Sequence, residues 1–110
     1  MIIVACGFDP SCYDPLARLS ASFDTFGEMT RMMMDAAAEL CGGKLVFVQE
    51  GGYSEEYAPL CGLKVISVLA GAELDMPEPR AAHVQSMQPT GRLLSLQLEM
   101  LDEIAAFLKL

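Results

Sequence analysis

The chain has 110 residues, which fits one domain or a piece of one. Apolar residues make up 53% of it and the formal net charge is -8, so a nucleic-acid partner, which needs clustered Lys and Arg, is not expected. No apolar run reaches the length needed to span a bilayer, and the chain starts without the basic region of a signal peptide. We therefore expect no membrane partner.

The four cysteines are Cys6, Cys12, Cys41 and Cys61, and no two of them form a C-x-x-C pair. Without a secretory signal, this usage predicts reduced thiols in a cytoplasmic protein. Their spacing does not favour a structural zinc site, because Cys6 and Cys12 lack the spacing of a zinc finger or ribbon.

A buried strand is predicted at the start of the chain. Residues 2–6 are a continuous apolar run rich in β-branched side chains, which is typical of a strand buried on both faces in a parallel sheet. A chain that begins directly inside such a strand is expected to be a piece of a larger domain. A polar loop with Pro10 and Pro15 follows, to about residue 22.

The next elements are a helix and a second strand. Ser22 or Asp24 can cap a helix whose apolar residues recur at helical spacing through Cys41, and the glycines of 42–43 provide a left-handed stop. Residues 44–49 predict a second buried strand, and residues 50–53 a tight turn.

A second helix is predicted from near Ser54 or Glu55 to Gly71, with Pro59 tolerated only in its first turn. Two strands joined through a helix should be parallel, with a right-handed crossover. The prolines and scattered charges of 72–89 indicate a linker, in which His83 is expected to be solvated.

The closing segment, 90–110, holds a last helix from roughly Thr90 to Leu108. Its apolar residues cover more than one face, so this helix needs burial on two sides.

Residues 1–71 thus predict a β-α-β-α core, followed by a linker and a helix. Two parallel strands make a poor sheet alone, because independent stability usually needs more strands or heavy helix cover. We expect a three-layer α/β arrangement in which residues 1–110 form the carboxy-terminal part of a larger parallel sheet.

A candidate site follows from this topology. Ligands of open parallel sheets bind beyond the carboxyl ends of the strands. The first strand ends at Asp9 and the second at Tyr53, on the same edge of the sheet. One carboxylate and one phenol are therefore predicted to face a common cleft.

Two motifs resemble those of the histone deacetylase superfamily. Gly7-Phe8-Asp9, followed by Asp14-Pro15-Leu16, is similar to the family's loop that holds a zinc ligand. Glu50-Gly51-Gly52-Tyr53 resembles its Gly-Gly-Tyr turn, which carries a catalytic tyrosine. The resemblance covers about residues 2–71 and is strongest to bacterial class II members, such as histone deacetylase-like amidohydrolases and acetylpolyamine amidohydrolases.

The resemblance implies an arginase/deacetylase-like fold, Zn²⁺ as cofactor, and hydrolysis of an acetylated amine such as acetyl-lysine or acetylpolyamine. Asp9 would be one of three protein ligands of a catalytic zinc. Tyr53 would donate its hydroxyl to the amide carbonyl as negative charge develops there. Gly51 and Gly52 would leave room for the acyl channel, and Asp14 would organise the loop.

The family's Asp-x-His and His-His motifs are absent, and His83 is the only histidine. We therefore expect this chain to be inactive alone, although the resemblance implies a zinc-dependent amidohydrolase for the full-length protein. The alternative is a non-catalytic interaction fragment that self-associates through its sheet edge and last helix, as a homo-oligomer.

Simpler interpretations stay open for single residues. Asp9 could be an ordinary turn aspartate, and Tyr53 a core-edge tyrosine with a backbone partner. Cys12 could line the cleft, although a free loop thiol is the simpler interpretation.

Overall fold

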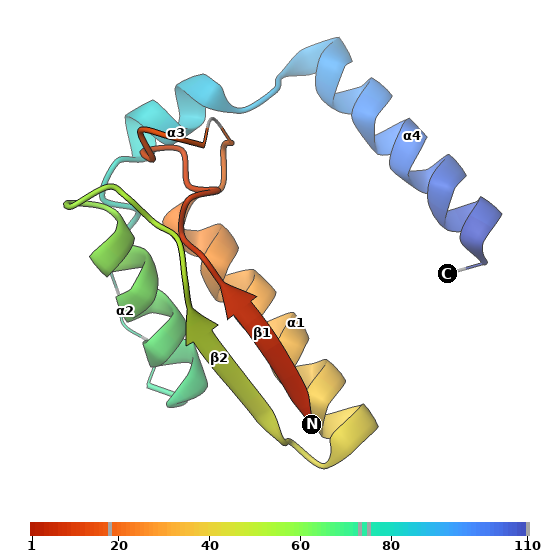
Figure 1. Ribbon diagram of the computed structural model, residues 1–110. Helices are drawn as coiled ribbons and strands as arrows, with labels where there is room; N and C mark the ends of the chain where they lie inside the picture. The colour runs from red at the N-terminus through yellow and green to blue at the C-terminus, as the bar shows by residue number, and fades with distance from the viewer. Residues whose placement is uncertain (18, 73, 75, 110) are drawn as a thin grey trace.

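A computed structural model describes residues 1–17, 19–72, 74 and 76–109. Its elements, in chain order, are β1 (Ile2–Cys6), α1 (Phe23–Cys41), β2 (Leu45–Gln49), α2 (Ala58–Leu69), α3 (Ala81–Met87) and α4 (Gly91–Leu108) (Figure 1). No helix in this described part combines the length and the apolar character that crossing a bilayer requires.

The two strands form a small parallel sheet. Its register pairs Ile2 with Leu45 at one end and Cys6 with Gln49 at the other. The polar termini of α1 are both capped within the chain, so this helix can connect the strands as a stable crossover. The predicted parallel pairing of an α/β fold is confirmed.

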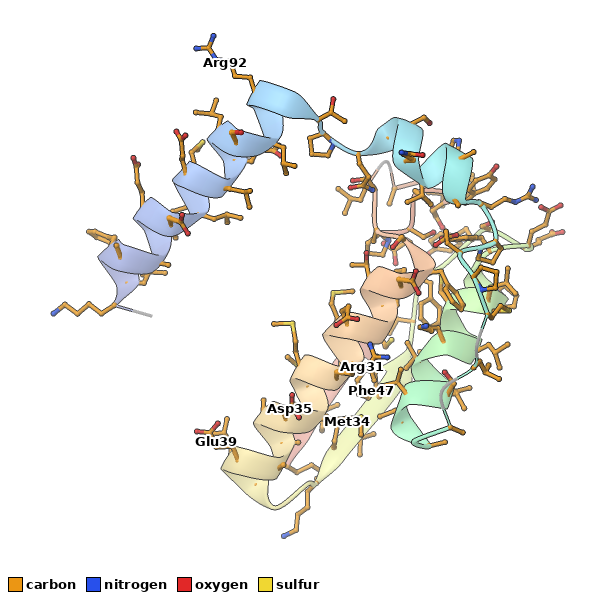
Figure 2. All side chains as sticks on the ribbon, turned by 180° about the vertical axis from the view of Figure 1, so that it is seen from behind. Arg31, Met34, Asp35, Glu39, Phe47 and Arg92 are labelled. Carbon is orange, nitrogen blue, oxygen red and sulfur yellow. The ribbon has the colours of Figure 1, made fainter. Side chains whose placement is uncertain are left out.

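Helices cover one face of this sheet. The side chains of Val4, Cys6 and Phe47 border a space that residues of α1 and α2 close from the other side. Figure 2, seen from the helix side, shows Phe47 between these two helices.

The opposite face is bare. Ile3 is 66% exposed, Val46 43% and Val48 46%. The prediction that both faces of each strand are buried is therefore wrong for the described part of the chain, because α1 and α2 lie on the same side. The three-layer arrangement stays a prediction.

The ends of α1 follow the sequence signals closely. The Ser22 hydroxyl accepts a hydrogen bond from the Thr25 amide at 3.1 Å, and the Ser22 amide donates to the Thr25 hydroxyl at 3.1 Å. This capping box satisfies two backbone groups at the helix start. Gly42, with φ 63°, ends the helix in the left-handed conformation, as predicted.

Helix α2 begins three to four residues later than predicted, at Ala58. The Ser54 hydroxyl accepts from the Tyr57 amide at 3.2 Å, and the Ser54 carbonyl accepts from the Ala58 amide at 3.0 Å. These bonds form a separate turn before the helix. Pro59 lies in the first turn of α2, where its missing amide costs nothing.

The segment predicted as a linker contains a helix, α3. Pro77 and Pro79 indicate a break, but a proline interrupts a helix only from within, and both precede Ala81. His83 consequently lies on α3, and its ring meets the Tyr13 ring at a centroid distance of 4.5 Å.

Helix α4 stands apart from the other elements (Figure 1), and Arg92 near its start points away from them (Figure 2). None of its described residues is buried. The predicted need for burial on two sides is therefore unmet in the described part of the chain.

The hydrophobic core lies between α1, α2 and the loop that follows β1. Phe8 and Phe26 meet edge to face, with ring centroids 5.3 Å apart. The buried members of this core are Phe8, Cys12, Phe23, Phe26, Tyr57, Cys61 and Val65. Cys12 is a free thiol of the loop, as the simpler interpretation predicts, and it is buried in this core.

Candidate functional site at the carboxyl edge of the sheet

The segments that follow the two strands run side by side. The Glu50 amide donates to the Cys6 carbonyl at 3.3 Å, and the Phe8 amide donates to the Gly51 carbonyl at 2.8 Å. Pairing thus continues beyond the ends of β1 and β2. The segment with Asp9 and the turn with Tyr53 consequently lie at one edge of the sheet, as the topology predicts.

The carboxylate of Asp9 lies against two glycines. A Cβ atom built on Gly7 would lie 2.5 Å from Asp9 Oδ1, and one built on Gly51 would overlap the same carboxylate. Asp9 can occupy this position only because both neighbouring residues lack a side chain.

Gly52 is required for a different reason. Its φ of 124° is a conformation that residues with a side chain rarely adopt. A Cβ atom here would also lie 2.9 Å from the Phe8 Cβ. The turn before Tyr53 therefore depends on glycine for its backbone conformation and for its close approach to the core.

Asp14 joins the two segments. Its Oδ1 accepts from the amides of Leu16 at 2.8 Å and Ala17 at 3.1 Å, while its Oδ2 accepts from the Tyr53 amide at 2.7 Å. Burial by itself would raise the pKa of Asp14, but these three donors outweigh it and the pKa lies below its usual value. The ionised carboxylate thus holds the backbone of Tyr53 against the loop that carries Asp9.

The Tyr53 side chain is 57% exposed and lines a hollow of about 520 Å³. Gln49, Gly52 and Glu55 are among its other walls. Asp9 is not among the described residues that line it. Asp9 and Tyr53 thus lie at the same edge of the sheet. That they face a common cleft remains a prediction.

The described residues do not by themselves fit a zinc site. Among them, no group of three or more His, Cys, Asp or Glu side chains is placed to hold a metal ion. Asp9 has suitable chemistry, because carboxylate oxygen is a zinc ligand. One such donor does not make a site, and His83 lies on α3 beside Tyr13.

Sequence reasoning missed a buried polar group beside this edge. Tyr57 is 1% exposed, and its hydroxyl accepts from the Phe23 amide at 2.8 Å and donates to Glu78 Oε1 at 2.8 Å. Burial first, and then the bond to Glu78, raises the pKa of Tyr57 well above its usual value. No spacing signal links positions 23, 57 and 78, because only the folded chain brings them together.

Comparison with known proteins places the chain in a family. Residues 1–69 match the family model of the histone deacetylase domain. A histone deacetylase-like amidohydrolase of Pseudomonas aeruginosa is 44% identical over 106 residues, which are 96% of this chain and 28% of that protein. A probable deacetylase of Archaeoglobus fulgidus is 38% identical over 74 residues, covering 66% of this chain and 21% of that protein.

A solved structure agrees. The match to the crystal structure of the HDA15 HD domain covers 94% of this chain and 28% of that chain, at a TM-score of 0.56 and 29% identity. The chain thus spans less than a third of the length of each of these relatives. With its two strand-end motifs on one edge of a parallel sheet, the chain belongs to the histone deacetylase family.

Proposed function

We propose that this chain is part of a zinc-dependent deacetylase, which hydrolyses an acetylated amine such as acetyl-lysine or acetylpolyamine to the free amine and acetate. One observation carries the proposal. Asp14 Oδ2 accepts from the Tyr53 amide at 2.7 Å and so fixes the turn with the phenol to the loop with Asp9. Family membership supports it, since the relatives include an amidohydrolase and a probable deacetylase.

Asp9 is the metal-binding residue in this proposal. Its carboxylate supplies one ligand, and the other ligands come from parts of the domain that this chain does not include. A bound catalytic zinc lowers the pKa of a water molecule and polarises the amide carbonyl. The glycines at positions 7 and 51 leave the space that the carboxylate occupies.

Tyr53 is the catalytic residue that this chain contributes. Its phenol is exposed, and Asp14 holds the backbone from which it projects. Donation to the amide carbonyl oxygen stabilises the charge that develops there. Gly52, which borders the hollow beside Tyr53, keeps that wall free of a side chain for the acyl group.

The isolated chain should be inactive, since no group of three or more His, Cys, Asp or Glu side chains among its described residues is placed to hold a metal ion. Four free thiols, two of them buried, fit a reducing, cytoplasmic location.

A chimera tests the proposal. In the Pseudomonas aeruginosa relative, the matching 106-residue segment is replaced by this chain, and hydrolysis of an acetyl-lysine peptide is measured. Tyr53→Phe should lower kcat about 10²–10³-fold, the usual effect of removing one oxyanion donor, and leave the zinc content unchanged.

Tyr13→Phe is the matched control, because it keeps the ring that contacts Tyr57 and His83. It should leave the rate close to that of the parent chimera. An unchanged rate in the Tyr53→Phe chimera would contradict the assignment.

The bare sheet face favours a second candidate function. A chain that exposes Ile3, Val46 and Val48 on one strand face could act as a non-catalytic fragment that self-associates. In that case the Tyr53→Phe change would have no effect on any activity of the chain, and changes on the strand face would alter its oligomeric state.

A further inference from the structure

Residues 76–88, here called the strap, lie across the loop that follows β1, described over residues 7–17 and 19–22. Figure 1 shows α3, the helical part of the strap, beside this loop. Met76 and Val84 of the strap also pack against the hydrophobic core. The strap lies beyond the residues that match the family model, 1–69, so that match assigns it no role.

The first attachment is at the start of α1. The Phe23 amide donates to the Tyr57 hydroxyl at 2.8 Å and to Glu78 Oε2 at 3.0 Å, and the Tyr57 hydroxyl donates to Glu78 Oε1 at 2.8 Å. An unpaired amide at a helix start carries partial positive charge, which a carboxylate stabilises. Glu78 thus links the strap to the residue at which the loop ends.

The second attachment is a cluster of ring contacts, with His83 edge to face on Tyr13. The Tyr13 ring contacts the Tyr57 ring at a centroid distance of 5.5 Å and the His83 ring at 4.5 Å. The Arg80 guanidinium lies 5.1 Å from the same ring and also pairs with Glu56 before α2. The middle of the loop is therefore held between α2 and the strap.

Two polar contacts complete the attachment. His83 Nε2 lies 3.4 Å from the Cys12 carbonyl, and Gln88 Nε2 donates to the Ser20 carbonyl at 2.9 Å. The loop is closed on itself by the Cys12 amide, which donates to the Ala21 carbonyl at 2.9 Å. The strap therefore contacts both sides of a closed loop.

We propose that the strap positions the loop that carries Asp9 and Asp14, with Tyr57 and Glu78 as its positioning residues. The contacts between strap and loop do not depend on the proposed function. Only the catalytic purpose of holding the loop in place rests on it. Neither residue reaches the reacting atoms in this account. They act through the loop, which in turn fixes Asp9 beside Gly51 and Asp14 beside the Tyr53 amide.

Hydrogen exchange of the 110-residue chain, read by mass spectrometry on peptides, tests this inference. Glu78→Ala removes the acceptor of the Tyr57 hydroxyl. Because a hydrogen bond to a charged group contributes about 1.5–3 kcal/mol, exchange in residues 8–17 and 19–21 should rise by about tenfold or more. Exchange in β1, β2 and the centre of α1 should stay at the parent level. Tyr57→Phe, which keeps the core ring, should show the same local effect.

Two controls separate positioning from a general loss of stability. Glu78→Gln keeps one oxygen acceptor for the Tyr57 hydroxyl but loses the charge and the second acceptor of the Phe23 amide, so it should restore part of the loop's protection and not all of it. Glu99→Ala removes an exposed carboxylate from α4 and should change nothing.

A uniform rise of exchange across strands, helices and loop would overturn the inference, as would an unchanged loop in both Glu78→Ala and Tyr57→Phe. The experiment uses neither metal nor substrate. A negative result in hydrogen exchange therefore does not contradict the deacetylase proposal. An inactive chimera, in turn, does not contradict the role of the strap.

Discussion

Two glycines decide how closely the Asp9 carboxylate can approach the neighbouring strand. A Cβ atom at Gly51 would overlap this carboxylate, and one at Gly7 would lie 2.5 Å from its Oδ1. Backbone flexibility is not the requirement at these two positions. The space itself is needed, because the proposed zinc ligand fills it.

Replacing Gly51 by Ala should therefore displace Asp9. We expect the free energy of unfolding to fall by about 1–3 kcal/mol, the usual cost of overfilling a packed position. Urea denaturation gives this value, and chemical-shift changes should centre on residues 8–10 and 51.

The matched control is Gly62→Ala. A Cβ atom there meets only the Phe8 ring, at 3.5 Å, and a helix gains roughly 0.5–1 kcal/mol from Ala over Gly. Equal effects of the two changes would contradict the steric role of Gly51.

Asp14 connects the two halves of the site through three backbone donors, and one of them is the Tyr53 amide. Because these donors lower the folded-state pKa below the unfolded value, the ionised carboxylate contributes stability above the unfolded pKa of about 3.9. This contribution is lost as the pH falls through the folded-state pKa.

Asp14→Asn should therefore destabilise the chain at pH 7, and the difference from the parent should shrink toward zero in acid below the ordinary Asp pKa. Urea denaturation at both pH values measures it. Asp102→Asn, on exposed α4, is the control and should show no such trend. A difference that persists unchanged in acid would show that the charge is not responsible.

At the scale of elements, local signals were sufficient wherever one residue decides a boundary. Ser22, one of the two predicted caps, starts α1, and Gly42 ends it as predicted, because a capping hydroxyl and a left-handed glycine act within a few residues. The parallel pairing of β1 and β2 followed from the helix between them.

The missed features depend on tertiary contacts. Helix α3 holds Val84, which packs on the core, and His83, which meets Tyr13, and neither contact has a signature within 72–89. The bond between Asp14 and Tyr53 spans 39 positions, so the two motifs could be placed at one edge but not seen to be joined. For the same reason, the sequence could not reveal Tyr57 and Glu78.

The bare strand face makes a prediction about association. Val46 and Val48 project from the side of the sheet that no described helix covers, and exposed apolar surface of this kind drives association. We expect the isolated parent chain to self-associate in size-exclusion chromatography with light scattering. The double change Val46→Lys and Val48→Lys should shift it toward the monomer.

Leu40→Lys is the control, since Leu40 is 73% exposed near the end of α1 and away from this face. It should leave the mass unchanged. A parent chain that is already a uniform monomer would contradict the prediction.

At the scale of the whole molecule, the chain covers 28% of the length of its Pseudomonas aeruginosa relative, and its described residues hold no group of three or more potential metal ligands. One face of the sheet is uncovered, and the described residues do not form a complete metal site. Both features are expected of a chain that spans only part of a larger domain. In the proposed function, the chain contributes the edge of the sheet at which Asp9 and Tyr53 both lie.

Metal content tests this account most directly. The chimera with the Pseudomonas aeruginosa relative is purified with and without Asp9→Asn, and zinc per chain is measured by mass spectrometry of the metal. The account predicts about one zinc in the parent, as for a single catalytic site, and most of it lost in the variant together with the deacetylase rate. Full zinc occupancy in the Asp9→Asn chimera would contradict it.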